Sequence, residues 1–280
     1  MLFTKINTAV PFEFFRRSFT GGILKGHTSD FHAMRFFIHG YFEWRIVVLV
    51  NKIIKIKPGD IIEVGANVGT ETVSFCKINQ DHNVHAFEPL IRNFKFLEQA
   101  KKINQFANLF LYKLLVSDKK GTTYFKIPEI GNSGSGHILE APIKGSKQIK
   151  MVTLDEKLKN ISSCSVIIMD VEGFESKVIS GSEKIINTFR PYLILEVNPK
   201  FLKERVGITV NTLFGQILEK GYRPCYIQRM RLKEIDIGKY DLASGSNWIC
   251  IPEEGMSNFI TLSRRIFANA INPIMKIKIF

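Results

Sequence analysis

Short apolar runs that stop at a polar residue recur along the chain. Such runs are typical of strands buried inside a parallel sheet. The predicted strands are residues 61–64, 83–87, 109–116, 165–169 and 192–195. Between and after them, apolar residues at three- and four-residue steps predict helices. The predicted helices are residues 70–77, 91–102, 178–187 and 210–220. This alternation predicts an α/β domain with a mainly parallel sheet.

Some segments before and after this alternation show a clear pattern and others do not. Residues 41–55 carry apolar side chains on one helical face, which predicts an amphipathic helix. Residues 1–40 are rich in Phe and basic residues and show no clean periodicity. The runs 225–228 and 247–251 lie too close together for a helical crossover, so we expect an antiparallel pair at a sheet edge. Residues 256–280 predict a basic amphipathic tail, lying on a membrane surface or packed on the protein itself.

A glycine loop follows the first predicted strand, from Glu63 through Gly65 to Gly69. Glycine lets the backbone turn sharply and approach a ligand closely, and the amides of the next helix would face that ligand. The spacing G-x-x-x-G is not the G-x-G-x-x-G of dinucleotide-binding proteins. The alternative is a tight turn in an ordinary α/β domain.

Polar residues also end the second and third predicted strands. Glu88 lies about twenty residues beyond the glycine loop, where an acid can accept hydrogen bonds from both hydroxyls of a ribose. The alternative is a carboxylate that faces solvent. Ser117 and Asp118 would lie over the same crevice and can hydrogen-bond an adenine, although a simple turn explains them equally well.

The fourth predicted strand ends at Asp170, and Glu172 and Glu175 follow closely. Carboxylates at this edge of a parallel sheet can take a substrate proton or hold a divalent cation. Acids at a helix N-terminus are the alternative, and for Glu175 we prefer it. His137 ends a polar glycine-rich loop and is a reserve candidate for the base, with a solvated histidine as the alternative.

A metal site is compatible with these acids without being required. Glu196 and Asn198 end the fifth predicted strand and, together with Asp170, offer oxygen ligands for an ion such as Mg²⁺. We therefore predict no metal ligands.

The positive charge is unevenly spread along the chain, and its distribution indicates which kinds of binding partner are favoured. Residues 1–57, 58–196 and 197–280 carry net charges of +6, +1 and +6, which sum to +13. Basic flanks suit an anionic surface such as lipid headgroups, and the absence of a dense basic run interleaved with aromatics disfavours nucleic acid. The four cysteines are far apart and predict buried thiols in a reducing compartment. With no apolar run that predicts a membrane span or a signal peptide, we expect a cytoplasmic protein, peripheral to the membrane at most.

Six ordered motifs together resemble the FkbM family of S-adenosylmethionine-dependent methyltransferases. They are Glu63-Val-Gly-Ala-Asn-Val-Gly69, Ala86-Phe-Glu-Pro89 with Asn93 and Leu97, Val116-Ser-Asp118 followed by Gly121, Thr153-Leu-Asp155, Asp170-Val-Glu-Gly173, and Arg190-Pro191 leading to Glu196. One departure is Met169, where the family often has Lys.

The resemblance implies a class I methyltransferase fold, which is Rossmann-like: a seven-stranded, mostly parallel sheet with helices on both faces and an antiparallel last strand. It implies that S-adenosylmethionine is the cofactor and that Glu88 holds its ribose. Glu63, Gly65, Asn67 and Gly69 would surround the methionine part. It also implies that Ser117 and Asp118 face the adenine, and that Asp170, Glu172 and Gly173 line the transfer site.

Family members mostly methylate hydroxyl groups, so the resemblance implies O-methylation of a carbohydrate, glycolipid or related metabolite, with Asp170 or Glu172 as the base. Nucleic-acid amino-methyltransferases commonly carry a Pro-Pro-aromatic motif where this chain has Val-Glu-Gly-Phe174, which argues against base methylation. The alternative function is a non-catalytic nucleotide- or membrane-binding accessory protein. We expect a basic extension (1–57), a methyltransferase domain (58–252) and a basic tail (253–280).

Overall fold

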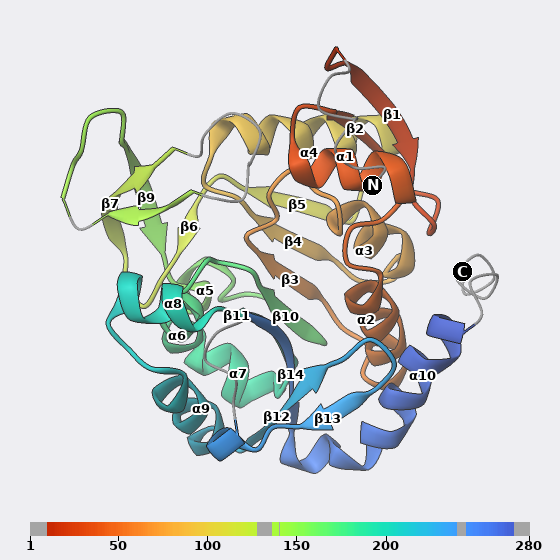
Figure 1. Cartoon of the computed structure of the whole chain (residues 1–280), viewed down its shortest axis with the longest axis vertical. Coiled ribbons are helices and arrows are strands. Elements are labelled where there is room, and N and C mark those ends of the chain that lie inside the picture. The colour runs from red at the N-terminus through yellow and green to blue at the C-terminus, as the bar shows by residue number, and fades with distance from the viewer. Residues whose placement is uncertain (1–9, 128–135, 140, 240–244, 272–280) are drawn as a thin grey trace.

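The computed structural model describes residues 10–127, 136–139, 141–239 and 245–271. An eight-stranded sheet crosses the molecule (Figure 1). From one edge to the other it contains β13 (Leu232–Glu234), β12 (Tyr222–Ile227), β14 (Ser246–Pro252), β11 (Tyr192–Val197), β10 (Val166–Met169), β3 (Ile61–Val64), β4 (Val84–Phe87) and β5 (Leu109–Tyr112).

The strand directions agree with the fold that the sequence predicts. From β5 to β11 all neighbours are parallel, and β14 is inserted antiparallel between β11 and β12. The sheet is therefore that of a class I methyltransferase, with β13 added at one edge. The predicted antiparallel pair is confirmed as β12 and β14, but it is not the sheet edge, because β13 continues the ladder beyond β12.

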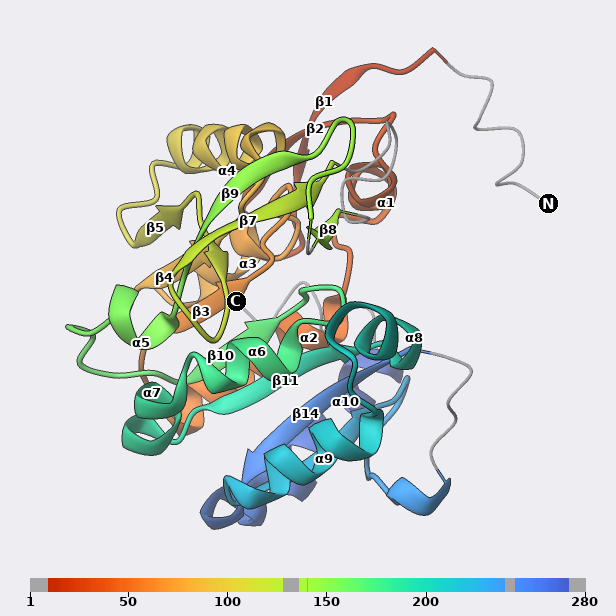
Figure 2. The same ribbon diagram turned by 90° about the vertical axis from the view of Figure 1, so that its left-hand side faces the viewer.

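Helices cover both faces of this sheet (Figures 1 and 2). One face packs against α2 (Trp44–Ile56), α3 (Thr72–Ile78), α4 (Ile91–Asn104) and α10 (Phe259–Ile271). The other packs against α5 (Leu154–Lys157), α6 (Glu175–Ser180), α7 (Glu183–Phe189) and α9 (Val210–Glu219). Each face buries its own apolar cluster, so the strands between them are apolar on both sides, as their sequences predict.

Short elements complete the chain. Helix α8 is Pro199–Phe201, a π-helical turn is Leu202–Val206, and 3₁₀ turns are Ile237–Lys239 and Glu253–Asn258. All four cysteines are buried and free, as predicted. None of the helices in the described residues is both long and apolar enough to span a bilayer.

The predicted third strand is wrong in one respect, because it is two strands in different sheets. After β5 the chain turns at Lys113 and Leu114 and continues as β6 (Leu115–Val116). Strand β6 joins a second, four-stranded sheet with β9 (Lys147–Val152), β7 (Gly121–Lys126) and β8 (His137–Leu139), in the order β6-β9-β7-β8. A small apolar cluster that includes Leu115 and Phe125 lies against this sheet and accounts for the switch.

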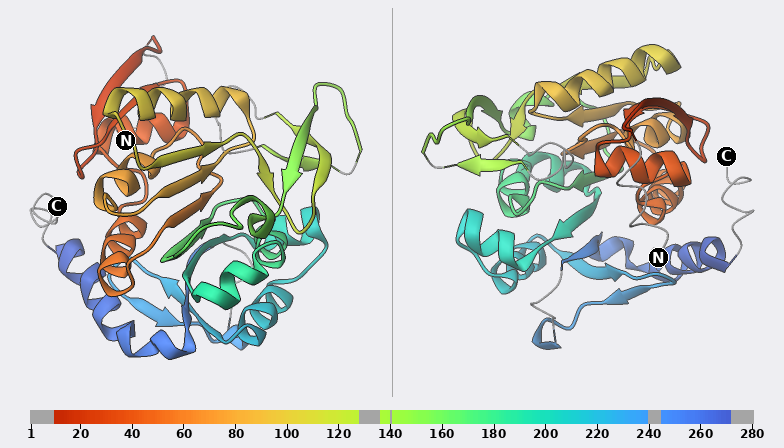
Figure 3. Two further views of the ribbon diagram at one scale, coloured as in Figure 1. Left: turned by 180° about the vertical axis from the view of Figure 1, so that it is seen from behind. Right: turned by 45° about the horizontal axis from the view of Figure 1, so that its top comes forward.

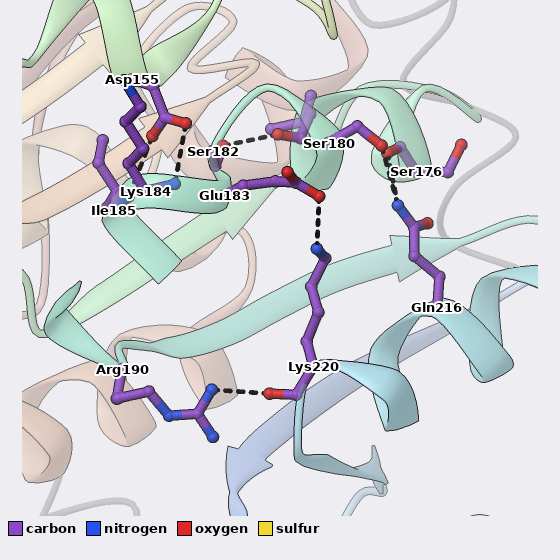
Figure 4. A network of polar contacts seen from close by, with 11 residues as sticks. Asp155, Ser176, Ser180, Ser182, Glu183, Lys184, Ile185, Arg190, Gln216 and Lys220 are labelled. Atoms are coloured by element: carbon purple, nitrogen blue, oxygen red, sulfur yellow. Dashed lines mark hydrogen bonds and ion pairs between the residues drawn. The ribbon is translucent and has the colours of Figure 1, made fainter. Parts of the chain in front are cut away.

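The predicted helix 178–187 is also divided, into α6 and α7. The break lies at Gly181, where an added Cβ would come within 2.0 Å of the backbone oxygen of Ser117. Asp155 accepts hydrogen bonds from the backbone nitrogens of Lys184 and Ile185 at 2.9 and 3.0 Å, so it holds the start of α7 (Figure 4). The close packing of Gly181 and the hydrogen bonds of Asp155 to the start of α7 therefore divide the helix, although the apolar periodicity of the sequence is continuous.

Residues 10–40, the described part of the segment that showed no periodicity, contain three elements. They are β1 (Glu13–Arg17), β2 (Ile23–His27) and α1 (Phe31–His39). Asp30 caps α1 by accepting from the nitrogen of Ala33 at 3.0 Å, and Gly40 ends it with a φ of +72°. Phe36 joins the apolar cluster of the main domain, so this segment is part of the main core.

We predict that replacing Gly65 by Ala destabilises the protein more than replacing Gly145. Both have a positive φ, of +89° and +83°, but a Cβ on Gly65 would lie 1.9 Å from the oxygen of Asp170, whereas nothing lies within 4 Å of a Cβ on Gly145. Backbone strain alone costs about 1–2 kcal/mol, which we expect for Gly145→Ala. Gly65→Ala should lower the free energy of unfolding in urea by at least about 3 kcal/mol, because the backbone must also move. Equal losses in the two variants would contradict this account.

Candidate functional site

A cavity of about 310 Å³ lies at the carboxyl ends of the central strands β3, β4 and β10. Its walls come from the glycine loop, the ends of these strands, the second sheet and the N-terminal segment. Its polar side chains are His32, Asn67, Glu88, Asn93, Asp170, Glu172 and Glu196. Parallel sheets bind ligands at this edge, so the cavity is the candidate active site.

The glycine loop forms the wall between β3 and β4. The nitrogens of Gly65 and Ala66 both donate to the oxygen of Phe87 at 3.0 Å, which binds the loop to the next strand. Asn67 has a φ of +50°, and its side-chain oxygen is buried without a hydrogen-bond partner among the described residues. Gly69 lies outside the cavity wall, where a Cβ would approach Leu97 to 2.8 Å. The loop therefore presents Gly65 and Asn67, while Gly69 serves packing.

Glu88 lies at the end of β4 and faces the cavity from a buried position. Its two carboxyl oxygens accept hydrogen bonds from the nitrogens of Asn67 and Leu90, at 3.0 and 2.9 Å. Asn93 donates a longer one at 3.4 Å. Burial raises the pKa of Glu88 to about 7, against the opposing effect of these hydrogen bonds. The carboxylate is thus held in one orientation at the cavity wall.

The side chain of Glu63, in β3, lies on the face of the sheet that packs against α3 and not on the cavity side. It accepts a hydrogen bond from the Thr72 hydroxyl of α3 at 2.6 Å and is not among the described residues that line the cavity. Burial, and then the negative charges of Glu71 and Glu88, raise its pKa well above the ordinary value. In this structure Glu63 is thus bound to the first residue of α3, and direct contact with a ligand stays a prediction.

Ser117 and Asp118 also lie outside the cavity wall. The Ser117 hydroxyl donates to Asp118 at 3.0 Å, and Lys177 of α6 forms an ion pair with Asp118 at 2.7 Å. Partial burial raises the pKa of Asp118, but the hydrogen bonds from Lys177 and Ser117 outweigh it and lower the pKa overall. Their neighbour Val116 does line the cavity. Contact of the two polar residues with an adenine stays a prediction.

Asp170 and Glu196 face the cavity together from the ends of β10 and β11. Sequence reasoning placed Glu196 after its strand, whereas it lies within β11, opposite Asn247 of β14. The Asp170 side chain is exposed by its accessible surface and opens into the cavity, where protein atoms surround its carboxyl. Poor hydration there, and then the negative charge of Glu196, raise the pKa of Asp170 well above the ordinary value. Such a group is suited to take up a proton.

Glu172 and Glu175 follow Asp170 and differ in their surroundings. Glu172 lines the cavity with a φ of +55°, and Arg205 donates to its backbone oxygen at 2.6 Å. Burial raises the pKa of Glu172 to about 7, although Arg205 opposes this. Glu175 is buried in the first turn of α6, as we preferred, and burial raises its pKa to about 8. Glu172 is thus the second carboxylate that can contact a ligand next to Asp170.

Sequence reasoning missed the contribution of the N-terminal segment. Three side chains of this segment line the cavity, namely Phe31 and His32 of α1 and Phe42, which follows α1. The ring centroids of His32 and Phe42 lie 4.7 Å apart. Burial lowers the pKa of His32, against the opposing charges of Asp30 and Glu196. The helix itself was marked in the sequence by the N-cap Asp30 and by Gly40, but its contact with the cavity was not.

The two remaining sequence hypotheses concern His137 and a metal ion. The backbone of His137 begins β8, while its side chain and most of the loop before it lie outside the described residues. Among the residues that the structure describes, no three His, Cys, Asp or Glu side chains are grouped so that they could hold a metal ion.

The charge of the cavity contrasts with that of the whole protein. Four acidic side chains line it, namely Glu88, Asp170, Glu172 and Glu196, and its described wall contains neither Lys nor Arg. One of the four, Glu172, forms an ion pair at 3.4 Å with Arg205, which lies behind the wall. The chain as a whole has a net charge of +13. A ligand with positive charge fits this cavity, and the phosphates of a dinucleotide would be repelled.

We compared the chain with family models, curated proteins and solved structures. The model of the methyltransferase FkbM domain matches residues 63–224. No curated protein matches the chain. Among solved structures, methyltransferase FkbM from Methylobacillus flagellatus KT is 14% identical with a TM-score of 0.45, and the match covers 68% of this chain and 43% of that one.

Two further structures are similar at the same level. The Methanococcus jannaschii fibrillarin pre-rRNA processing protein is 15% identical with a TM-score of 0.41, over 69% of this chain and 66% of that one. Aeropyrum pernix fibrillarin, in complex with natively bound S-adenosyl-L-methionine, is 12% identical with a TM-score of 0.40, and the match covers 74% of this chain and 73% of that one.

The chain spans less than half of the first of these structures, at 43%, and about two thirds of the second, at 66%. The domain model, in contrast, matches more than half of this chain, and its span begins at the glycine loop and includes Glu88 and Asp170. The chain belongs to the FkbM methyltransferase family.

Proposed function

We propose that this protein transfers a methyl group from S-adenosylmethionine to a hydroxyl group of a carbohydrate, a glycolipid or a related metabolite. Membership of the methyltransferase family supports the reaction. The choice of cofactor is supported above all by the charge of the cavity, in which four carboxylates face no Lys or Arg of the described wall. S-adenosylmethionine carries positive charges on its sulfur and its amino group, so it complements such a cavity.

The described residues fit this cofactor in three places. Gly65 lets the loop pack closely on the backbone of Asp170, where a Cβ would clash, so that both residues lie in one wall of the cavity. The buried side-chain oxygen of Asn67 lacks a partner among the described residues, so it is free to accept a hydrogen bond. The fixed carboxylate of Glu88 has the position and the acceptor oxygens to hold two ribose hydroxyls.

The chemistry asks the chain mainly to position an acceptor and to remove a proton. Bound S-adenosylmethionine supplies a methyl group on a positively charged sulfur. Asp170 takes the proton of the acceptor hydroxyl, because its raised pKa makes the ionised form a stronger base than an ordinary carboxylate. Glu172 is the second candidate, since it also lines the cavity.

The acceptor side of the cavity supports a sugar-like molecule. Phe31 and Phe42 offer flat apolar surfaces to the carbon-bound hydrogens of a sugar ring. The carboxylates of Glu196 and Glu172 offer acceptors to its hydroxyl groups. A strongly anionic acceptor would be repelled by the same carboxylates.

We predict that Glu88→Gln weakens binding of S-adenosylhomocysteine about 10- to 100-fold, because hydrogen bonds to a charged group contribute about 1.5–3 kcal/mol each. Isothermal titration calorimetry measures the change. The matched control is Glu98→Gln, an exposed position on α4, which should bind like the wild type. No binding by the wild type, or equal binding by both variants, would reject the proposed cofactor site.

Binding of S-adenosylhomocysteine should tighten as the pH rises from 6 to 8. With a pKa of about 7, Glu88 is ionised to about 10% at pH 6 and to about 90% at pH 8. Only the ionised form can accept a hydrogen bond from each ribose hydroxyl with both oxygens, because the protonated form carries a hydrogen on one of them. The affinity should therefore rise up to about ninefold. Glu88→Gln should remove most of this dependence. If Glu172→Gln removes it instead, the titrating group is Glu172, whose pKa is also about 7.

Asp170→Asn should lower the rate of methyl transfer at least about 100-fold and leave the affinity for S-adenosylhomocysteine within about threefold of the wild type, because the loss falls on proton removal. The assay incubates the protein with labelled S-adenosylmethionine and with fractionated glycans, lipids and RNA. Glu204→Gln, on the exposed π-helical turn, is the control. Label in the RNA fraction alone would refute the proposed acceptor class, and label in no fraction would favour a non-catalytic accessory protein.

A further inference from the structure

Helix α10 has two apolar faces, and within the described part of the chain only one of them is buried. Leu262 and Ile266 are fully buried against the main core, where α10 lies along α2 (Figure 3). On the opposite side Ile260, Phe267 and Ile271 are 60%, 49% and 58% exposed. They are spaced by seven and four residues, so they form one stripe along the helix. We call these three residues the apolar stripe.

A groove with four basic residues runs beside the apolar stripe, between α10 and α2. Lys52 and Lys55 come from α2, and Arg264 and Arg265 come from α10. We call these four residues the basic groove. Ion pairs bind many other Lys and Arg side chains, but none of these four forms one with a described residue. Their charge is therefore not neutralised within the described part of the chain.

Neither feature is needed to hold α10 in place. The buried residues on its other side already attach the helix to the core, whereas an exposed apolar stripe and four crowded cations both oppose solubility or stability of the isolated protein. The sequence beyond α10 continues the same composition, with Ile274, Lys276, Ile277, Lys278 and Phe280. An apolar strip bordered by basic side chains is typical of helices that lie in the surface of a membrane.

We propose that the apolar stripe and the basic groove together dock the protein on the surface of an anionic lipid bilayer. The apolar stripe enters the boundary between headgroups and acyl chains, and the basic groove contacts the lipid phosphates. A second copy of the chain is a poorer occupant, because a symmetric dimer through this face would bring two basic grooves together. This inference is independent of the methyl acceptor and of the cofactor.

Sedimentation with lipid vesicles tests the proposal on the full chain. Vesicles of phosphatidylcholine with about 30% phosphatidylglycerol should bind the protein, and vesicles of phosphatidylcholine alone should bind it far less. Binding should weaken as salt is raised, because screening reduces the contribution of the basic groove. Failure of the wild type to bind the anionic vesicles would overturn the proposal.

Two pairs of variants assign the binding to this face. Lys55→Glu with Arg264→Glu should weaken binding at least about 30-fold, as expected for two basic residues lost near an anionic surface. The matched control is Lys95→Glu with Lys150→Glu, which changes the net charge equally at exposed positions on α4 and β9 and should cost less than about threefold. Equal losses in both pairs would mean that net charge alone drives binding, and would overturn the proposed face.

The apolar stripe is tested in the same way. Ile260→Ser with Phe267→Ser should weaken binding about 10-fold or more, whereas Leu218→Ser with Met230→Ser, which are exposed apolar residues elsewhere, should not. A far-UV circular dichroism spectrum and a urea unfolding midpoint like those of the wild type show that each variant is folded. If the first pair instead dissociates a dimer of the wild type and leaves vesicle binding intact, the occupant is a second copy and the proposal is wrong.

Discussion

The close contact between Gly65 and the backbone of Asp170 determines how the candidate site is assembled. The two residues end neighbouring parallel strands, and the nitrogen of Asp170 donates to the oxygen of Val64 at 3.0 Å. A Cβ at Gly65 would come within 1.9 Å of the Asp170 oxygen, so only glycine permits this approach. The loop proposed to hold the cofactor and the carboxylate proposed to act on the acceptor are thus positioned by the backbone of one strand pair. Sites built on rigid elements in this way need little further ordering when a ligand binds.

The carboxylates around this contact carry an energetic cost. Burial raises the pKa of Glu88 to about 7 and that of Glu175 to about 8, from an ordinary value of 4.5. A pKa raised on folding contributes stability that is complete below about pH 4.5 and is lost as the pH rises through 7 and 8. As far as these two carboxyls contribute, the protein without a ligand is therefore less stable at pH 8 than at pH 4.5. Glu88 lines the cavity and Glu175 does not, so a positively charged ligand would offset the cost at Glu88, where the fixed carboxyl is a form of electrostatic preorganisation.

The sequence predicted most of the sheet and the region of the site, because both depend on local patterns. Strand ends are marked by polar residues, and Glu175 lies in the first turn of a helix, as its place shortly after the fourth strand indicates. The division of residues 109–116 between two sheets was beyond such patterns, since it depends on which distant strand each half pairs with. For the same reason, no local pattern indicated that Phe31 and His32 would reach the cavity.

The side on which Glu63 lies follows from a rule that sequence reasoning did not apply. Successive side chains of a strand point to opposite faces, and Val64 lines the cavity, so Glu63 must point away from it towards α3. Asn67, beyond the strand, is free of this alternation and does reach the cavity. The period of the strand therefore decides which residues of the motif line the cavity. Two other residues of the motif contact the neighbouring helices instead, because Glu63 accepts from Thr72 of α3 and Gly69 packs against Leu97 of α4.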